Sequence, residues 1–160
     1  MTLFEFTTEK SAQNWHAVDD VVMGGVSRSK LDVAEGGTAR FSGRLSLEQG
    51  GGFASVRYDK TAFDLGGYEG LELRVKGDAK TYQLRLHTDA PRVAYAQPFH
   101  AASDWTTLRL PFADFIPTFR GRDVPSAPPL NRSAVREVGM MLADKQAGDF
   151  ELLIGFIRAY

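Results

Sequence analysis

Apolar and polar side chains alternate at every second residue over much of this chain, most clearly near its middle. One segment shows the pattern without interruption, Leu71-Glu72-Leu73-Arg74-Val75-Lys76. The same period returns in residues 82–87. Because successive side chains of a β-strand point to opposite faces of the sheet, the pattern predicts antiparallel strands with one buried face and one exposed face.

Further strands are expected wherever this pattern continues between turn-forming residues: 28–34, 38–47, 53–58, 93–99, 105–110, 138–143 and 150–157. Gly36-Gly37 is expected to form the hairpin turn after the first of these. The last two segments are almost wholly apolar, which predicts central strands covered on both faces. Roughly ten short strands with almost no helix signal predict an all-β fold, an antiparallel jelly-roll β-sandwich.

Two segments interrupt the alternation. Residues 19–27 combine two acidic residues with the pair Gly24-Gly25, and glycine permits a positive φ or a close approach of two backbones. Asp19 and Asp20 are expected to cap backbone N–H groups in this turn. Residues 111–122 are rich in aromatic residues and contain two prolines, and they are expected to form a long ordered loop.

Length and composition narrow the class of protein. With 160 residues, one jelly-roll domain over residues 1–160 can bury a sizeable core. The chain has no cysteine, which excludes disulfides, thiolate catalysis and cysteine-ligated metals. A net charge of −1 gives no overall field that would attract nucleic acid. No apolar run is long enough to span a membrane and the N-terminus has no signal sequence, so a cytoplasmic protein is expected.

Catalytic motifs are not found in the sequence. The three histidines are not at metal-ligand spacing, and no nucleophile elbow, phosphate-binding loop or dinucleotide fingerprint occurs. Asp19 and Asp20 are adjacent and would point to opposite sides of an extended segment, so they do not form an acid–base pair. We expect no catalytic residue, no metal site and no cofactor. The alternative that the sequence leaves open is a structural Ca²⁺ bound by loop oxygens of Asp19, Asp20 and Asp149.

Arginines inside predicted strands are the best candidates for binding. The pleat sets Arg85 beside Gln83 and His87, on the face opposite Leu84. On an open concave sheet these residues would form a polar floor for a carboxylate, a phosphate or a sugar hydroxyl. The alternative is that they only solvate the sheet and form cross-strand ion pairs.

Two loops and the aromatic residues extend this hypothesis. The complete set of predicted binding residues is Asp20, Arg57, Gln83, Arg85, His87 and Arg120. Arg120 lies in the aromatic segment, where it is either a partner contact or the charged tip of a turn. The aromatic residues Trp15, Tyr68, Tyr82, Tyr95 and Trp105 would either stack on sugar rings or pack in the core.

Several motifs occur together and in order: Trp15, Asp19–Ser27, Phe41–Gly43, Gly51–Arg57, Tyr68–Leu71, Arg74–Asp78, Leu110–Phe112 and Arg120-Gly121. Over about residues 4–157 they resemble the complex I intermediate-associated protein 30 family. The resemblance implies a galactose-binding-domain-like jelly roll and a non-enzymatic role, since its eukaryotic members are chaperones that hold a membrane-arm intermediate during assembly of respiratory complex I. No mitochondrial leader is recognised, so a short bacterial member is expected.

The sequence therefore predicts a binding or assembly-factor module that holds a protein partner, with a respiratory-complex subunit or intermediate as one candidate. A carbohydrate-binding module is the alternative, because that function is common for this architecture. A hydrolase or lyase on the same scaffold is a third, weaker reading, because no acid–base pair occurs at a workable spacing.

Overall fold

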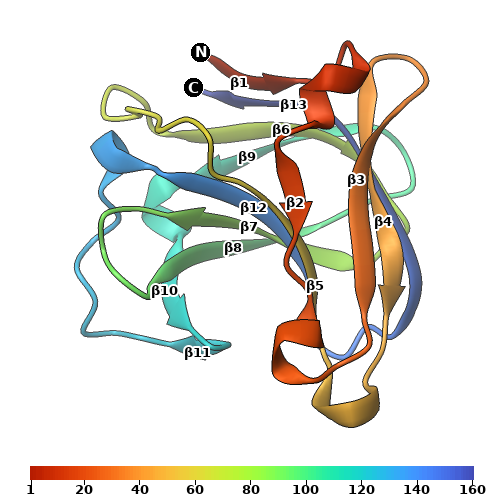
Figure 1. The fold of residues 1–160 in the computed structure, drawn as a ribbon. Coiled ribbons are helices and arrows are strands. Elements are labelled where there is room, and N and C mark those ends of the chain that lie inside the picture. The colour runs from red at the N-terminus through yellow and green to blue at the C-terminus, as the bar shows by residue number, and fades with distance from the viewer.

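The structure is a computed structural model that describes residues 1–21, 24–49 and 51–160. Two antiparallel sheets pack face to face (Figure 1). The first sheet contains β1 (Thr2–Glu5), β3 (Arg28–Ala34), β4 (Thr38–Leu45), β6 (Gly70–Lys76), β9 (Thr106–Pro111) and β13 (Gly148–Ala159). The second contains β2 (Trp15–Ala17), β5 (Ala54–Tyr58), β7 (Thr81–His87), β8 (Ala94–His100), β10 (Ile116–Phe119), β11 (Arg122–Asp123) and β12 (Glu137–Leu142).

Strand order joins segments that are far apart in the sequence. The six-stranded sheet runs β3-β4-β13-β6-β9, and β1 also pairs with β13. The seven-stranded sheet runs β11-β10-β8-β7-β12-β5-β2. The predicted all-β jelly-roll sandwich is confirmed, and β12 and β13 are central in their sheets as expected.

The remaining regular structure consists of short 3-10 helices at Glu9–Ala12, Asp20–Met23, Glu48–Gly50, Phe112–Asp114 and Arg132–Ala134. None of the helices in the described ranges has the length and apolar character needed to cross a bilayer. Val22 and Met23 of the Asp19–Ser27 motif, and Gly50, lie outside the described residues.

The alternation that predicted the strands also places the core. On β7, Tyr82, Leu84 and Leu86 are fully buried between the sheets, whereas Gln83, Arg85 and His87 are half-buried on the opposite face. Burying apolar surface contributes about 25 cal/mol per Å² and fixes this register, since a shift by one residue would expose the apolar set.

Aromatic rings close one end of the core. Phe4 packs against Trp15 and against Tyr58, each at 4.9 Å between ring centroids, and against Phe63 at 5.7 Å. Phe6 is fully buried beside them. These contacts join β1 of one sheet to β2 and β5 of the other.

Two expectations need correction. Residues 111–122 are not only a loop, because they contain β10 and the start of β11. Strand β13 was expected to be covered on both faces, yet buried and less buried residues alternate along it, so one face is partly exposed. Strand β12 does have nearly every residue buried.

Candidate functional site

A groove of about 710 Å³ lies on the outer face of the seven-stranded sheet. Strands β5, β12, β7 and β8 supply its floor, and β10 with the turn after it supplies a wall. All six residues predicted for binding line this groove: Asp20, Arg57, Gln83, Arg85, His87 and Arg120. The structure thus brings together residues from two strands and two connecting segments, spread over 100 positions of the sequence.

The centre of the floor is one row of residues that crosses five strands. Strand pairing sets Arg57 opposite Gly139, Gly139 opposite Arg85, Arg85 opposite Ala96, and Ala96 opposite Ile116. Two strand spacings put the Cα atoms of Arg57 and Arg85 about 10 Å apart. The row therefore changes from cationic to apolar across the groove.

Gly139 lies between the two arginines, where there is little room for a side chain. A Cβ at this position would lie 3.1 Å from the carbonyl oxygen of Val56 and 3.3 Å from Cγ of Arg57. Both distances are tighter than ordinary van der Waals contact, so the position favours glycine. The absence of a side chain lets the stem of Arg57 pack closely against the backbone of β12.

Arg85 is held by neutral partners. Its Nη1 donates to Oε1 of Gln83 at 2.9 Å and its Nη2 to Oγ1 of Thr118 at 3.5 Å, while its Nε is buried without a hydrogen-bond partner among the residues that the structure describes. Burial, together with the nearby positive charge of Arg57, lowers the pKa of Arg85 to about 10, and Glu137 offsets this only in part. The guanidinium remains charged at neutral pH.

The negative charge nearest to these arginines is engaged elsewhere. Oε2 of Glu137 lies 2.8 Å from Nδ1 of His87, and Oε1 lies 3.9 Å from Nη1 of Arg57. Burial opposes ionisation of Glu137, but the His87 hydrogen bond and the charges of His87, Arg57 and His16 hold its pKa below the usual value. Arg57 and His87 therefore share one carboxylate.

Asp20 lines the groove, but its carboxylate serves the fold. Oδ1 accepts a hydrogen bond from the N–H of Ser27 at 2.9 Å, and Oδ2 accepts from the N–H of Gly52 at 2.7 Å and of Phe53 at 3.3 Å. The hydroxyl of Ser27 donates to Oδ2 as well. Burial opposes ionisation, and these hydrogen bonds outweigh it and lower the pKa of Asp20. The capping expected from the sequence is present, and it leaves Asp20 little capacity to bind a ligand.

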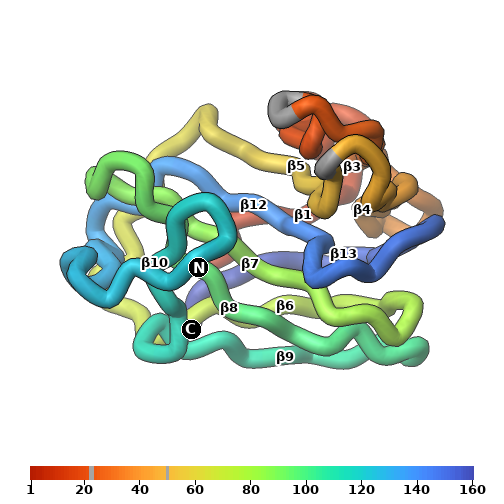
Figure 2. Tube along the Cα trace, turned by 90° about the horizontal axis from the view of Figure 1, so that it is seen from below, coloured from red at the N-terminus to blue at the C-terminus, as the bar shows by residue number. Residues whose placement is uncertain are grey.

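The two loops joined by Asp20 lie side by side in both views (Figures 1 and 2). Gly24 has a φ of 89°, which a side chain would disfavour. A Cβ on Gly25 would lie 2.8 Å from Cα of Gly51. The glycine pair therefore provides both properties expected from the sequence, a positive φ and a close backbone approach. Asp19 similarly accepts from the N–H groups of Ser29 and Ser55 at 3.0 Å.

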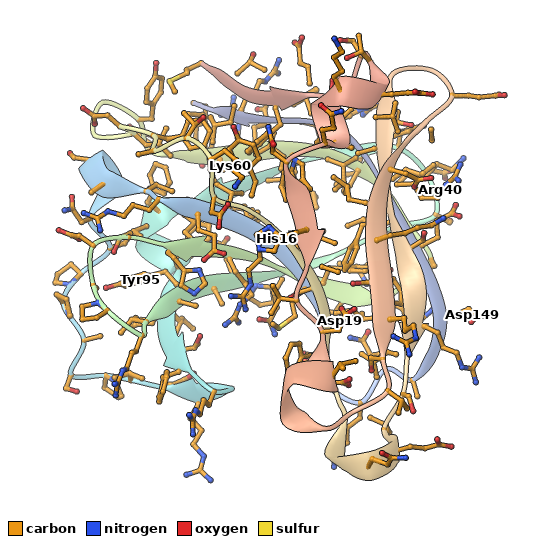
Figure 3. All side chains as sticks on the ribbon, in the orientation of Figure 1. His16, Asp19, Arg40, Lys60, Tyr95 and Asp149 are labelled. Carbon is orange, nitrogen blue, oxygen red and sulfur yellow. The ribbon has the colours of Figure 1, made fainter. Side chains whose placement is uncertain are left out.

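The residues considered for Ca²⁺ do not converge. Asp149 pairs with Arg44 at 3.3 Å on the six-stranded sheet, and Figure 3 shows it away from Asp19. A different set does converge: His16, Asp59 and Glu137 each place one ligand atom within 4.8 Å of the others. Its donors suit a transition metal, but Glu137 already contacts His87 and Arg57. Sequence spacing could not reveal it, because its members lie on or beside three different strands.

The aromatic residues proposed for sugar stacking are elsewhere. Trp15, Tyr82 and Tyr95 are buried in the core, and Tyr68 packs partly against it. Trp105 lies under Arg74 at 5.6 Å, beside a second hollow on the other sheet. The aromatic side chains that line the groove are those of Phe53 and Phe119.

Three residues at the groove were not predicted from the sequence. They are Gly139, which is buried between Arg57 and Arg85, and the groove-lining Thr118 and Ile116. The first is an ordinary glycine in an apolar run, and the others belong to β10, which was expected to be a loop. Residues 116–119 read Ile-Pro-Thr-Phe and do not alternate between apolar and polar side chains, so the sequence contains no local signal for this strand.

Comparison with known proteins gives consistent results. A family model described as complex I intermediate-associated protein 30 matches residues 4–154. An uncharacterised protein of Schizosaccharomyces pombe is 32% identical, over 92% of this chain and 80% of that protein. A Caenorhabditis elegans protein named as a probable mitochondrial complex I intermediate-associated protein 30 is 28% identical, over 98% of this chain and 53% of its own length. The mouse protein named as mitochondrial complex I intermediate-associated protein 30 is 24% identical, over 99% and 55%.

The chain therefore spans about half the length of these worm and mouse relatives. Among solved structures, the family 11 carbohydrate-binding module of a Clostridium thermocellum cellulase superposes with a TM-score of 0.74 at 15% identity, over 98% of this chain and 92% of that one. At this identity the likeness shows a shared fold.

Proposed function

This chain belongs to the complex I intermediate-associated protein 30 family, and from that premise we propose that it is a non-enzymatic module that holds a protein partner. The observation that carries the proposal is the groove, in which Arg57 and Arg85 lie beside an exposed apolar wall. Charged and apolar groups arranged in this way favour a specific protein contact.

The wall is exposed to a degree unusual for such side chains. Ile116 is 47% exposed and Phe119 39% exposed, and both line the groove. Clustered exposed apolar groups cost solvation free energy unless a partner covers them. Arg120 stacks over the Phe119 ring at 5.2 Å and adds a cation to the same wall.

The identity of the partner is a finer part of the proposal. Relatives whose names refer to complex I intermediates make a respiratory-complex subunit or assembly intermediate the first candidate. Those names also include the word mitochondrial. The cytoplasmic location expected for this chain stays a prediction.

Affinity purification with quantitative mass spectrometry tests the proposal. The double variant Ile116→Asp, Phe119→Asp removes the apolar wall without touching the core. Leu47→Asp is the matched control, because Leu47 is 44% exposed and lies outside the groove. We expect a partner to be recovered with wild type and the control and lost with the double variant. Equal recovery from all three proteins would show that the groove is not the contact surface.

Carbohydrate binding is the second candidate, and the hydrogen-bonding side chains of Gln83, Arg85 and His87 on the groove floor favour it. Phe53 and Phe119, rather than Trp or Tyr, supply the aromatic lining of the groove, so the protein contact is preferred. Calorimetric titration with soluble oligosaccharides separates the two. Saturable binding that is lost in Gln83→Ala would favour the sugar, and heats that match buffer dilution would remove it.

A further inference from the structure

We infer that the groove binds a carboxylate carried by its partner, and that Arg85 and Arg57 hold this carboxylate between them. The inference rests on the proposed function and makes it more specific, because it names the chemistry that the partner must present. Glutamate or aspartate side chains and a C-terminal carboxyl group share that chemistry.

The first argument is unbalanced charge. Arg85 has two neutral acceptors, Gln83 and Thr118, and no carboxylate of the described residues lies within 4.0 Å of it. A half-buried guanidinium without a counter-ion is costly, and proteins usually pair such charges. Glu137 is divided between Arg57 and His87, so it neutralises neither arginine alone. An anion from outside would complete the charge balance.

The second argument is geometry. Arg57 and Arg85 point from strands on either side of β12, to the same face of the sheet, with Gly139 between them. The missing side chain at Gly139 lets the stem of Arg57 pack closely against the backbone of β12, the strand that separates the two arginines. Guanidinium is planar and donates in pairs, which matches the two oxygens of a carboxylate.

The third argument concerns what surrounds the cations. Ala96 and Ile116 continue the same row on the other side of Arg85. A partner residue whose carboxylate meets Arg85 would thus place its neighbouring side chains against an apolar wall. Asp123 and Asp144 also line the groove, but both are exposed residues at its edge, outside this row. The floor accordingly selects an acidic residue flanked by apolar residues.

Three matched peptides test the ligand chemistry on the purified protein. The first is acetyl-Ser-Leu-Glu-Leu-Ser-amide, the second has Gln in place of Glu, and the third is the Gln peptide with a free C-terminus. The ¹⁵N resonance of Arg85 Nε and the peptide Kd are followed by NMR. We expect the Glu peptide, the free-acid peptide or both to shift this resonance and to bind about tenfold more tightly than the neutral peptide, the ratio for one lost charge-assisted contact. Whichever of the two acidic peptides binds identifies the source of the carboxylate, a side chain or a C-terminus. Equal Kd values for all three peptides, or no shift at Arg85, would overturn the inference.

Substitutions assign the effect to residues. Arg85→Met and Arg57→Met should each weaken binding of the acidic peptide about tenfold, whereas Arg44→Met on the six-stranded sheet should not change it. Arg85→Lys keeps the charge but loses the planar pair of donors, so an intermediate Kd is expected. Because Arg85 lacks an internal counter-ion, the melting temperature of Arg85→Met should equal or exceed that of wild type. A marked fall in melting temperature would instead show that Arg85 serves the fold.

The same variants separate this inference from the proposed function. If Arg85→Met and Arg57→Met recover the native partner as well as wild type does, while Ile116→Asp, Phe119→Asp loses it, the groove is the contact surface and the carboxylate assignment is wrong. If the double variant also recovers the partner, the proposed function fails together with the inference. Loss of the partner in the arginine variants, with acidic-peptide preference in wild type, supports both.

Discussion

Asp20 shows how one side chain can organise two loops that are distant in the sequence. Its carboxylate accepts hydrogen bonds from Ser27, Gly52 and Phe53, and it is almost completely buried. Hydrogen bonds to a charged group contribute more than those between neutral groups, and a buried donor left without an acceptor is costly. The motif that dominates the sequence is therefore a structural clamp at the rim of the groove.

Asp20→Asn is expected to lower the free energy of unfolding by about 2 kcal/mol. The NH₂ group of the asparagine side chain only donates hydrogen bonds, so it cannot accept the bonds that one carboxylate oxygen of Asp20 accepts. Urea denaturation followed by tryptophan fluorescence measures the change. Asp149→Asn is the control, since Asp149 forms an exposed ion pair with Arg44, and its effect should stay within about 0.5 kcal/mol. Equal effects of the two variants would contradict the clamp.

The pH dependence of stability follows from the same residue. The pKa of Asp20 is lower in the folded protein than its ordinary value, so the ionised group stabilises the fold above that ordinary value. This contribution is lost as the pH falls through the folded pKa. Asp78 and Glu137, whose pKa values are also lowered, act in the same direction.

We therefore expect the free energy of unfolding of wild type to fall as the pH is lowered from about 5 to about 2. The fall should be smaller in Asp20→Asn, which has no carboxylate to protonate at this position. Urea denaturation at a series of pH values measures both curves. Parallel curves would show that Asp20 makes no linked contribution.

At the residue scale, the sequence predicted the position of a side chain correctly where the position depends only on neighbouring residues in the chain. The pleat placed Gln83, Arg85 and His87 on one face, and turn chemistry indicated that Asp19 and Asp20 would cap backbone groups; both are found. The role of Gly139 could not be predicted. It depends on which strands lie on either side of β12, and no local pattern contains that information.

At the scale of elements, β12 determines the shape of the groove floor. It is an interior strand of the seven-stranded sheet, and it separates the two strands that carry Arg57 and Arg85. Nearly all of its residues are buried, so it forms a rigid base. A larger side chain on this strand would therefore reduce the space on the groove floor above it.

Gly139→Ala is expected to raise the Kd of the acidic peptide about tenfold, because the added methyl group would lie 3.3 Å from Cγ of Arg57 and displace that side chain. Overpacking at this position should also cost about 1 kcal/mol of stability. Gly52→Ala is the matched control, since Gly52 lines the groove but a Cβ there would meet no atom within 4 Å. NMR titration of both variants decides the matter, and equal Kd values for the two would exclude a role for Gly139 in positioning Arg57.

Strand β10 explains why element prediction failed in residues 111–122. Pro117 lies in the middle of this strand, and proline normally argues against a strand because it lacks a backbone donor. Here β11 pairs with Thr118 and Phe119, and at the proline the outer neighbour is only Val124, whose N–H donates to the carbonyl oxygen of Pro117 at 2.9 Å, so β10 lies close to the edge of the sheet there. An edge position tolerates the missing donor, and only the assembled sheet reveals that the position is an edge.

At the scale of the whole molecule, the first strand closes the sandwich. Phe6 is fully buried and Phe4 nearly so, and their rings contact Trp15 of the opposite sheet. The two-layer architecture was predictable because alternation reports burial. The order of the strands was not, because it depends on contacts such as β1 with β13, between opposite ends of the chain.

Phe6→Ala should lower the free energy of unfolding by about 3–5 kcal/mol, through lost burial and the cavity that remains. Leu47→Ala is the control, because Leu47 is 44% exposed, and a change within about 0.5 kcal/mol is expected there. Urea denaturation measures both. A loss below about 1 kcal/mol for Phe6→Ala would show that the aromatic end contributes little to the core.

The pairing of β1 with β13 has a practical consequence. The terminal amine of Met1 donates to the carbonyl oxygen of Ala159, and Figure 1 shows both termini together. They leave from the six-stranded sheet, whereas the groove occupies the outer surface of the other layer. A fused domain or an immobilising tag could therefore be attached at either end while the opposite surface stays free to meet its partner from solution.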